Sequence, residues 1–245
     1  MADKAKTSVD KLSSIYLGKT TPLRTAVWRV RRGLRDILKG RDVLDVEVSS
    51  RKTGQAIRKT YRTIDSFMGH FFPGSRQIVS KEIATKRLTD MIEELGYTIV
   101  DADETKPWGA YYRMNDSEVS RFVSEFFPGL SLKEAKLGHD DVGLSPKFLL
   151  VMPGHRLSWQ YHGRRAERWR FLTDGAYHKS ATDDQNERNI VKAGEVVQFS
   201  QGERHRLCAD KNSYTLVAEI WQHTDPDNPS EEADIVRLSD DYQRG

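Results

Sequence analysis

The stretch that decides the fold is residues 153–175, PGHRLSWQYHGRRAERWRFLTDG. Gln160 and His162 lie two positions apart in an extended, alternating run, so on a strand both side chains leave the same face. Glu167 follows after a short bend, and we expect Gly175 to close a second strand. The stretch therefore predicts two neighbouring strands that carry an amide, an imidazole and a carboxylate.

A second imidazole lies far along the chain, at His205 in the segment 202–207, GERHRL. An amide, two imidazoles and a carboxylate suit a borderline or hard divalent cation, and zinc, iron and manganese all fit this set. The alternative is that the same residues are ordinary polar strand and loop residues. We predict a site for one divalent cation, and its four expected ligands are Gln160, His162, Glu167 and His205.

The stretch 153–175 resembles the first cupin motif, with Gln160 in place of its first histidine, and the segment 202–207 resembles the second. More narrowly, the stretch is similar to the type II phosphomannose isomerase branch of the cupins, whose members carry a run like PGxxLSLQxHxxRAEHW. The chain departs from that run at Arg168, where the family has a histidine.

Two further segments support this resemblance. Residues 106–111, KPWGAY, are similar to the family's opening RPWGxY, and residues 234–244, DIVRLSDDYQR, are similar to its closing DIVRFEDxYGR. The matches occur in the family's order and span about residues 106–244. Between Glu219 and the closing segment the chain runs longer than the family does, which affects the expected substrate more than the fold.

The fold class that follows is α+β. Cupins are double-sheet jelly rolls, so the resemblance implies an all-β cupin domain, a double-stranded β-helix, over residues 106–245. Evenly spaced short strands after residue 145 agree, because they are typical of an antiparallel barrel or sandwich. For residues 1–102 we expect a smaller, basic and mostly helical domain of unknown role, joined through an acidic linker at residues 101–106.

The two parts of the chain differ in charge. Residues 1–100 hold 20 Lys and Arg against 11 Asp and Glu, whereas the remainder holds 19 against 25. Periodic apolar residues predict helices over 21–40 and 80–95, and an alternating run predicts a strand over 43–48. The basic surplus leaves open an anionic partner for this half, although a solvated helix face is the simpler interpretation.

Three arginines take roles from the resemblance. The family's functional arginines lie in its RAEHW segment and its closing segment, which implies a catalytic role for Arg165 and substrate binding by Arg237 and Arg244. A planar guanidinium suits a phosphate anchor because it can pair with two oxygens at once. The alternative for the tail pair is surface ion pairing with Asp240 and Asp241.

Two further catalytic candidates also rest on the family. Lys147 stands where the family has a strand lysine that faces the cavity, and it could hold a substrate oxygen or phosphate. Glu219 stands in the family's IEVQ segment and is a candidate base, with His155 as its rival. A buried Glu paired with Lys would give the same pattern.

The function that the resemblance implies is a metal-dependent aldose–ketose isomerase for a sugar phosphate, first of all mannose 6-phosphate, acting through an enediol or enediolate. A sugar-sensing regulator with a nucleic-acid-binding basic half is one alternative, and another metal-dependent cupin enzyme such as an oxygenase is a second. No apolar run reaches the length of a membrane span, so we expect a cytoplasmic protein without a membrane partner. The resemblance also allows a homodimer, because cupins often pair through their sheets.

Overall fold

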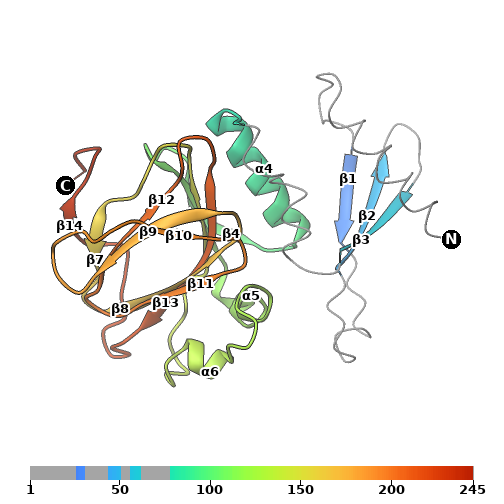
Figure 1. Cartoon of the computed structure of the whole chain (residues 1–245). Coiled ribbons are helices and arrows are strands. Elements are labelled where there is room, and N and C mark those ends of the chain that lie inside the picture. Colours follow the sequence, from blue (N-terminus) through green and yellow to red (C-terminus); the bar gives the residue numbers. More distant parts are fainter. Residues whose placement is uncertain (1–25, 31–43, 51–55, 62–77, 245) are drawn as a thin grey trace.

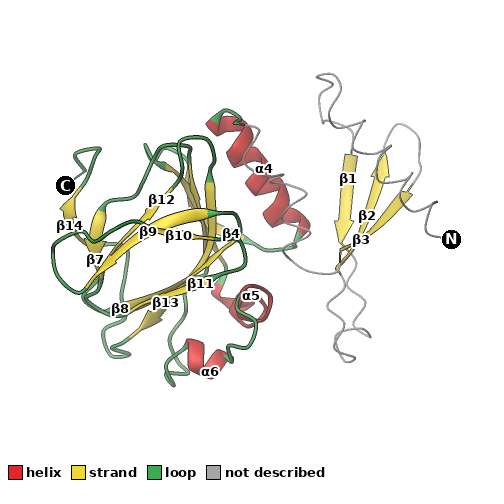
Figure 2. Cartoon of the chain, viewed as in Figure 1, coloured by secondary structure: helices red, strands yellow, loops and turns green. Residues whose placement is uncertain are grey.

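A computed structural model describes residues 26–30, 44–50, 56–61 and 78–244 of the chain (Figure 1). Strands dominate the described part, and helices are few (Figure 2). No helix in these ranges is long and apolar enough to cross a membrane. The cytoplasmic location and the homodimer stay predictions.

Two antiparallel sheets form the C-terminal part of the molecule. The six-stranded sheet has the order β11-β8-β13-β6-β5-β4, and the five-stranded sheet has the order β10-β9-β12-β7-β14. The strands of the first are β4 (Ile99–Asp103), β5 (Gly109–Met114), β6 (Lys147–Val151), β8 (Arg165–Phe171), β11 (Val196–Phe199) and β13 (Thr215–His223). Those of the second are β7 (Trp159–Tyr161), β9 (Gly175–Ser180), β10 (Asn189–Val191), β12 (Arg204–Cys208) and β14 (Val236–Ser239). The double-sheet jelly roll predicted for residues 106–245 is confirmed, but the same range also holds short helices and is not all-β.

Alternation along the strands divides the apolar residues between two cores. One core lies between the sheets, where Trp169 and Phe199 of the first sheet pack with Leu207 of the second. The other core lies on the outer face of the six-stranded sheet, which carries Phe148 and Ile220. Both faces of this sheet are therefore buried, and β13 is buried along its whole length.

Helices cover the outer face of the six-stranded sheet. They are α4 (Lys81–Glu94), the 3-10 turn η1 (Asp116–Glu118), α5 (Val119–Phe126) and α6 (Leu132–Ala135). The helix predicted over 80–95 is confirmed as α4, which begins after the cap residue Ser80 and ends before Gly96, at φ +69°. Leu88 of α4 is fully buried in the same core as Phe122 of α5 and Phe148 of β6.

The predicted linker at residues 101–106 is wrong over its first half. Asp101 and Asp103 belong to β4, and β4 pairs with β5 at the edge of the six-stranded sheet. Half-buried Ile99, Asp101 and Asp103 alternate there with exposed Val100 and Ala102, as expected for an edge strand with one face open to solvent. Together with the packing of α4, this pairing extends the folded C-terminal unit upstream to about residue 80.

In the N-terminal part, three strands form an antiparallel sheet, β1 (Ala26–Val30), β2 (Leu44–Ser50) and β3 (Ala56–Tyr61). The strand predicted over 43–48 is confirmed as β2. The helix predicted over 21–40 is wrong at β1, where two valines and a tryptophan favour an extended chain. The rest of that helix lies outside the described residues, so the mostly helical character of residues 1–102 stays a prediction.

One boundary beside the site also differs from the expectation. Gly175 opens strand β9 and does not close the strand before it. A Cβ at this position would lie 2.5 Å from Thr215 Cγ2, so the close approach of β9 and β13 requires a glycine.

Candidate metal centre

The centre lies at one end of the space between the sheets, where the inward side chains change from apolar to polar. Strand register brings them together: His205 of β12 pairs with Gln160 of β7, and Glu167 of β8 pairs with Trp221 of β13. Lys147 of β6 adds a further inward side chain one strand away. Residues far apart in the sequence thus share one buried end of the barrel.

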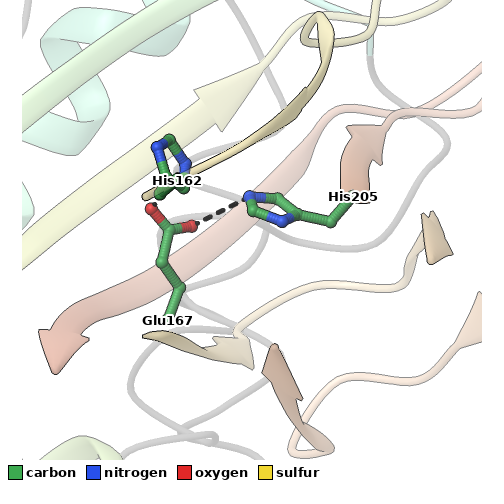
Figure 3. A group of neighbouring side chains, drawn as sticks. All are labelled: His162, Glu167 and His205. Carbon is green, nitrogen blue, oxygen red and sulfur yellow. Dashed lines mark ion pairs between the residues drawn. The ribbon is translucent and has the colours of Figure 1, made fainter. Parts of the chain in front are cut away.

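His162, Glu167 and His205 point toward one another (Figure 3). His162 Nε2 lies 3.1 Å from Glu167 Oε1, and His205 Nε2 lies 3.2 Å from Glu167 Oε2. All three side chains are buried. Two atoms that bind one ion at about 2.1 Å can lie no more than about 4.2 Å apart, so these spacings are compatible with a shared cation.

Hydrogen bonds to backbone carbonyls fix both rings. His162 Nδ1 donates to the carbonyl of Asp234 at 2.6 Å, and His205 Nδ1 donates to the carbonyl of Glu203 at 2.9 Å. Each Nε2 therefore presents a lone pair to the centre, which is the arrangement usual for metal-bound histidines. Among the described residues His205 Nε2 has no hydrogen-bond partner, and it faces a carboxylate oxygen that is also an acceptor. A cation would satisfy both atoms, so the donor set fits a divalent metal.

The charges of the centre agree with this arrangement. Burial alone would raise the pKa of Glu167, but the groups around it, including the fixed positive charge of Arg165, hold that pKa well below its ordinary value. Burial lowers the pKa of His162, which favours the neutral ring. An ionised carboxylate and a neutral imidazole are the forms that bind metals.

The fourth predicted ligand is oriented differently. Gln160 is buried beside the centre, but its amide nitrogen faces His162, at 3.5 Å from Nε2. Its carbonyl oxygen instead accepts a hydrogen bond from the Ser158 hydroxyl. The structure therefore brings three of the four predicted donor groups together. The Gln160 oxygen would join them only after a half-turn of the amide.

Arg165 lies against the centre and is held by the protein. Its Nε donates to Glu167 Oε1 at 2.8 Å, one terminal nitrogen contacts His162 Nε2 at 3.2 Å, and the other donates to the Ser230 hydroxyl at 2.8 Å. The guanidinium also stacks on Trp221, with 3.6 Å from Cζ to the ring centroid. These contacts suit a residue that positions Glu167 better than one that anchors a substrate.

Glu219 is a second buried carboxyl near the centre. Trp169 Nε1 donates to its Oε1 at 2.8 Å, and Trp221 Nε1 donates to its Oε2 at 3.2 Å. Burial, with a further contribution from the charge of Glu167, raises the pKa of Glu219 to about 8. At neutral pH this carboxyl is therefore mostly protonated, and it can exchange a proton in either direction near pH 8.

Lys147 faces the same space from β6. Its ammonium is buried, contacts the ring of Trp221 at 3.4 Å from the centroid, and pairs with the exposed side chain of Glu232. Burial lowers the pKa of Lys147, while Glu219 and Glu232 oppose that change. Lys147 is therefore buried beside the centre. Its predicted role stays a prediction.

Three predicted residues remain: Arg237, Arg244 and His155. Arg244 forms a two-pronged ion pair with Asp240, with distances of 2.6 and 2.9 Å, which is the alternative considered for it. Arg237 lies on β14 opposite Gln160. His155 Nδ1 lies 2.9 Å from the Tyr242 hydroxyl, and no described contact joins it to the centre. Substrate binding by the two arginines stays a prediction.

Sequence reasoning assigned residues 224–235 no place at the centre, although the structure brings this segment against it. Its Asp234 carbonyl orients His162, and its Asp234 carboxylate accepts hydrogen bonds from the backbone nitrogens of Gly163 and Arg164 at 2.9 and 3.0 Å. Ser230 and Glu232 of this segment reach Arg165 and Lys147. Trp221 was also missed, although alternation from Glu219 would have placed it on the same face.

Comparisons with known proteins add little beyond the fold. No family model matches the sequence, and no curated protein matches it. Similar solved structures include a double-stranded beta-helix protein from Klebsiella pneumoniae, 14% identical, with a TM-score of 0.31, covering 39% of this chain and 74% of that one. A DMSP lyase from Ruegeria pomeroyi is 12% identical, with a TM-score of 0.29 and coverage of 37% and 44%. An oxalate oxidase in complex with glycolate is 17% identical, with a TM-score of 0.36 and coverage of 56% and 58%.

These similarities have narrow limits. The chain spans less than two thirds of the lyase and of the oxidase, and at these TM-scores the matches do not indicate what it binds. The sheet topology carries the fold assignment, and double-stranded β-helix proteins are among the structures that the chain resembles.

Proposed function

We propose that the chain is a metal-dependent enzyme that interconverts the aldose and ketose forms of a sugar phosphate, with mannose 6-phosphate as the first substrate to test. One observation carries the proposal: three buried donors converge beside the buried carboxyl group of Glu219, whose pKa burial raises to about 8 when no metal is bound. Moving a proton between C1 and C2 of a sugar needs a group that can both accept and donate it.

The residues of the centre would have three different roles in this reaction. When bound by His162, Glu167 and His205, a divalent cation would supply polarisation of the sugar carbonyl. Ionised Glu219 accepts the proton from C2 and, once protonated, returns it to C1, so the carboxyl ends the cycle as it began. Arg165 holds Glu167 in position through its 2.8 Å contact.

Lys147 supplies a buried positive charge for an anionic group of the substrate. In the structure the Glu232 carboxylate forms an ion pair with this ammonium group. Glu232 is largely exposed, so it can leave without losing a buried environment of its own. A substrate phosphate or ionised oxygen would then replace it on the ammonium.

The test is turnover by purified, metal-loaded protein on a panel of aldose and ketose phosphates that begins with mannose 6-phosphate. We expect conversion by the wild type and a loss of kcat of about a hundredfold or more in Glu219→Gln, the usual contribution of a general acid or base. The matched control is Glu187→Gln on the exposed surface, which should retain full activity. Folded, metal-loaded protein that converts none of the panel, and whose Tm none of them raises, would refute the proposal.

A metal-dependent oxygenase is the second candidate. Two imidazoles and one carboxylate are also the donor set of non-haem iron oxygenases, and the centre supplies these three groups. Loading the protein with ferrous iron and measuring oxygen consumption separates the two proposals. Consumption that depends on His205 and an organic substrate would favour the oxygenase.

The regulator hypothesis depends on the basic first hundred residues, most of which lie outside the described ranges. It predicts salt-dependent binding of duplex DNA by the full chain, because phosphate contacts release counterions. Absence of binding at low salt would exclude this function and leave both enzyme proposals untouched.

A further inference from the structure

A hollow of about 530 Å³ lies on the outer face of the six-stranded sheet, between the α5–α6 turn and strands β8 and β11. Alternation along β8 turns Arg168 toward this hollow while Glu167 faces the metal centre. The volume falls within the range of small-molecule sites. This outer hollow is therefore a separate place from the candidate centre.

Arg168 presents the two terminal nitrogens of its guanidinium group at the outer hollow. Its Nε donates to Gln198 Oε1 at 2.6 Å, which fixes the guanidinium. Its two terminal nitrogens have no hydrogen-bond or ion-pair partner among residues 78–244. Burial lowers the pKa of Arg168, with Glu134 opposing the change, so the charge is partly desolvated without a close counter-ion. A planar carboxylate would match the free edge of the fork.

Gln222 provides a second polar group in the lining of the hollow. The side chain is 1% exposed, and its amide nitrogen donates to the carbonyls of Glu134 and Ala135 at 3.4 and 2.9 Å. These two bonds fix the amide orientation and leave Oε1 as a buried acceptor that has no partner in the described part of the chain. A hydroxyl or amino group that reached Oε1 would satisfy it.

The other walls are apolar and partly open to solvent. Phe127 and Leu130 line one side, and Leu137 and Val196 line the hollow while remaining 45% and 44% exposed. Apolar walls with a few fixed polar groups are typical of sites for small organic ligands. They disfavour a strongly hydrated dianion, as does the negative charge of Glu134 beside Arg168.

We propose that the outer hollow binds a small organic carboxylate with an apolar body and a hydroxyl or amino group next to the carboxylate. The carboxylate pairs with the terminal nitrogens of Arg168, the neighbouring donor reaches Gln222 Oε1, and the apolar body packs between Leu137 and Val196. This site does not depend on the metal centre, so it stands whichever enzyme proposal is correct.

The test is calorimetric titration of the full chain with 3-phenyllactate as the probe. We expect a dissociation constant of about 1 mM or tighter for the wild type, and at least about tenfold weaker binding in Arg168→Gln, as for loss of a charge-assisted pair. The control Arg188→Gln, which removes an exposed arginine paired with Asp210, should bind as the wild type does.

Two further arms keep the test decisive. Val196→Glu leaves Arg168 intact but adds a negative charge at an exposed position of the hollow, so it should also weaken binding. The analogue 3-phenylpropanoate lacks the hydroxyl and should bind less tightly than 3-phenyllactate. Absence of binding by the wild type, or equal binding by wild type, Arg168→Gln and Val196→Glu, would overturn the proposal.

Discussion

Replacing Glu219 with glutamine should remove a large part of the pH dependence of folding. Glutamine has the shape of the protonated carboxyl and keeps an acceptor for the 2.8 Å bond from Trp169. Its amide nitrogen cannot accept the weaker bond from Trp221, which costs about 1 kcal/mol at every pH. The substitution therefore changes the free energy of unfolding in two ways: by a constant loss at every pH and by a part that depends on pH.

The pH-dependent part follows from the two pKa values. Glu219 titrates at about 8 in the folded chain and at 4.5 ordinarily. Below pH 4.5 both states hold the proton, and between these values the folded chain holds it while the unfolded chain does not. The free energy of unfolding therefore falls as pH rises through this window, by at most about 5 kcal/mol at 1.36 kcal/mol for each pKa unit.

The assay is urea unfolding of metal-free wild type and Glu219→Gln between about pH 5 and pH 8, followed by tryptophan fluorescence. The stability advantage of the wild type should shrink steadily with pH, while titrations elsewhere affect both proteins equally. Bound metal should reduce the effect, because a nearby cation favours the ionised carboxylate. Parallel stability curves for the two proteins would show that Glu219 is not held protonated, and the proposed proton exchange would fail with it.

Four other substitutions test separate parts of the structure. Glu167→Gln and His205→Ala should each lower the bound metal measured by elemental analysis to well under one ion per chain, while Glu187→Gln keeps it; equal metal content in all of them would contradict the centre. Leu88→Ala should lower the free energy of unfolding by about 2–5 kcal/mol in a single cooperative transition, because Leu88 is fully buried against the barrel; an unchanged barrel transition would separate α4 from this unit. Gly109→Ala should prevent folding or cost more than about 3 kcal/mol, judged by circular dichroism, because its Cβ would lie 1.8 Å from the Leu150 carbonyl oxygen at φ +154°.

The sequence contained strong local signals for part of the fold. Helix α4 was predictable because a serine cap, an apolar stripe and a terminal glycine all agree. The strands that became β6 and β13 were predictable from dense apolar runs. Strand β1 was misjudged because apolar residues at helical spacing compete there with β-branched residues, and tertiary pairing decides between them.

The candidate centre was predictable only in part, for geometric reasons. Motif spacing brought out His162, Glu167 and His205, which the barrel does place together. Motif spacing could not predict the orientation of the Gln160 amide, because a hydrogen bond from the Ser158 hydroxyl determines which amide atom faces the centre. Residues 224–235 have no periodic pattern, so their place across the centre follows from polar contacts that only the folded chain reveals.

Asp234 couples the position of residues 224–235 to the orientation of the His162 ring. Its carbonyl fixes the ring of His162, and its carboxylate fastens the same segment to the backbone beside that ring. If residues 224–235 swing away to admit a ligand, the imidazole loses its orienting bond at the same moment. The rate at which residues 224–235 move away should then limit the release of the ion. The rate at which a chelator removes the metal would therefore measure how often this segment opens.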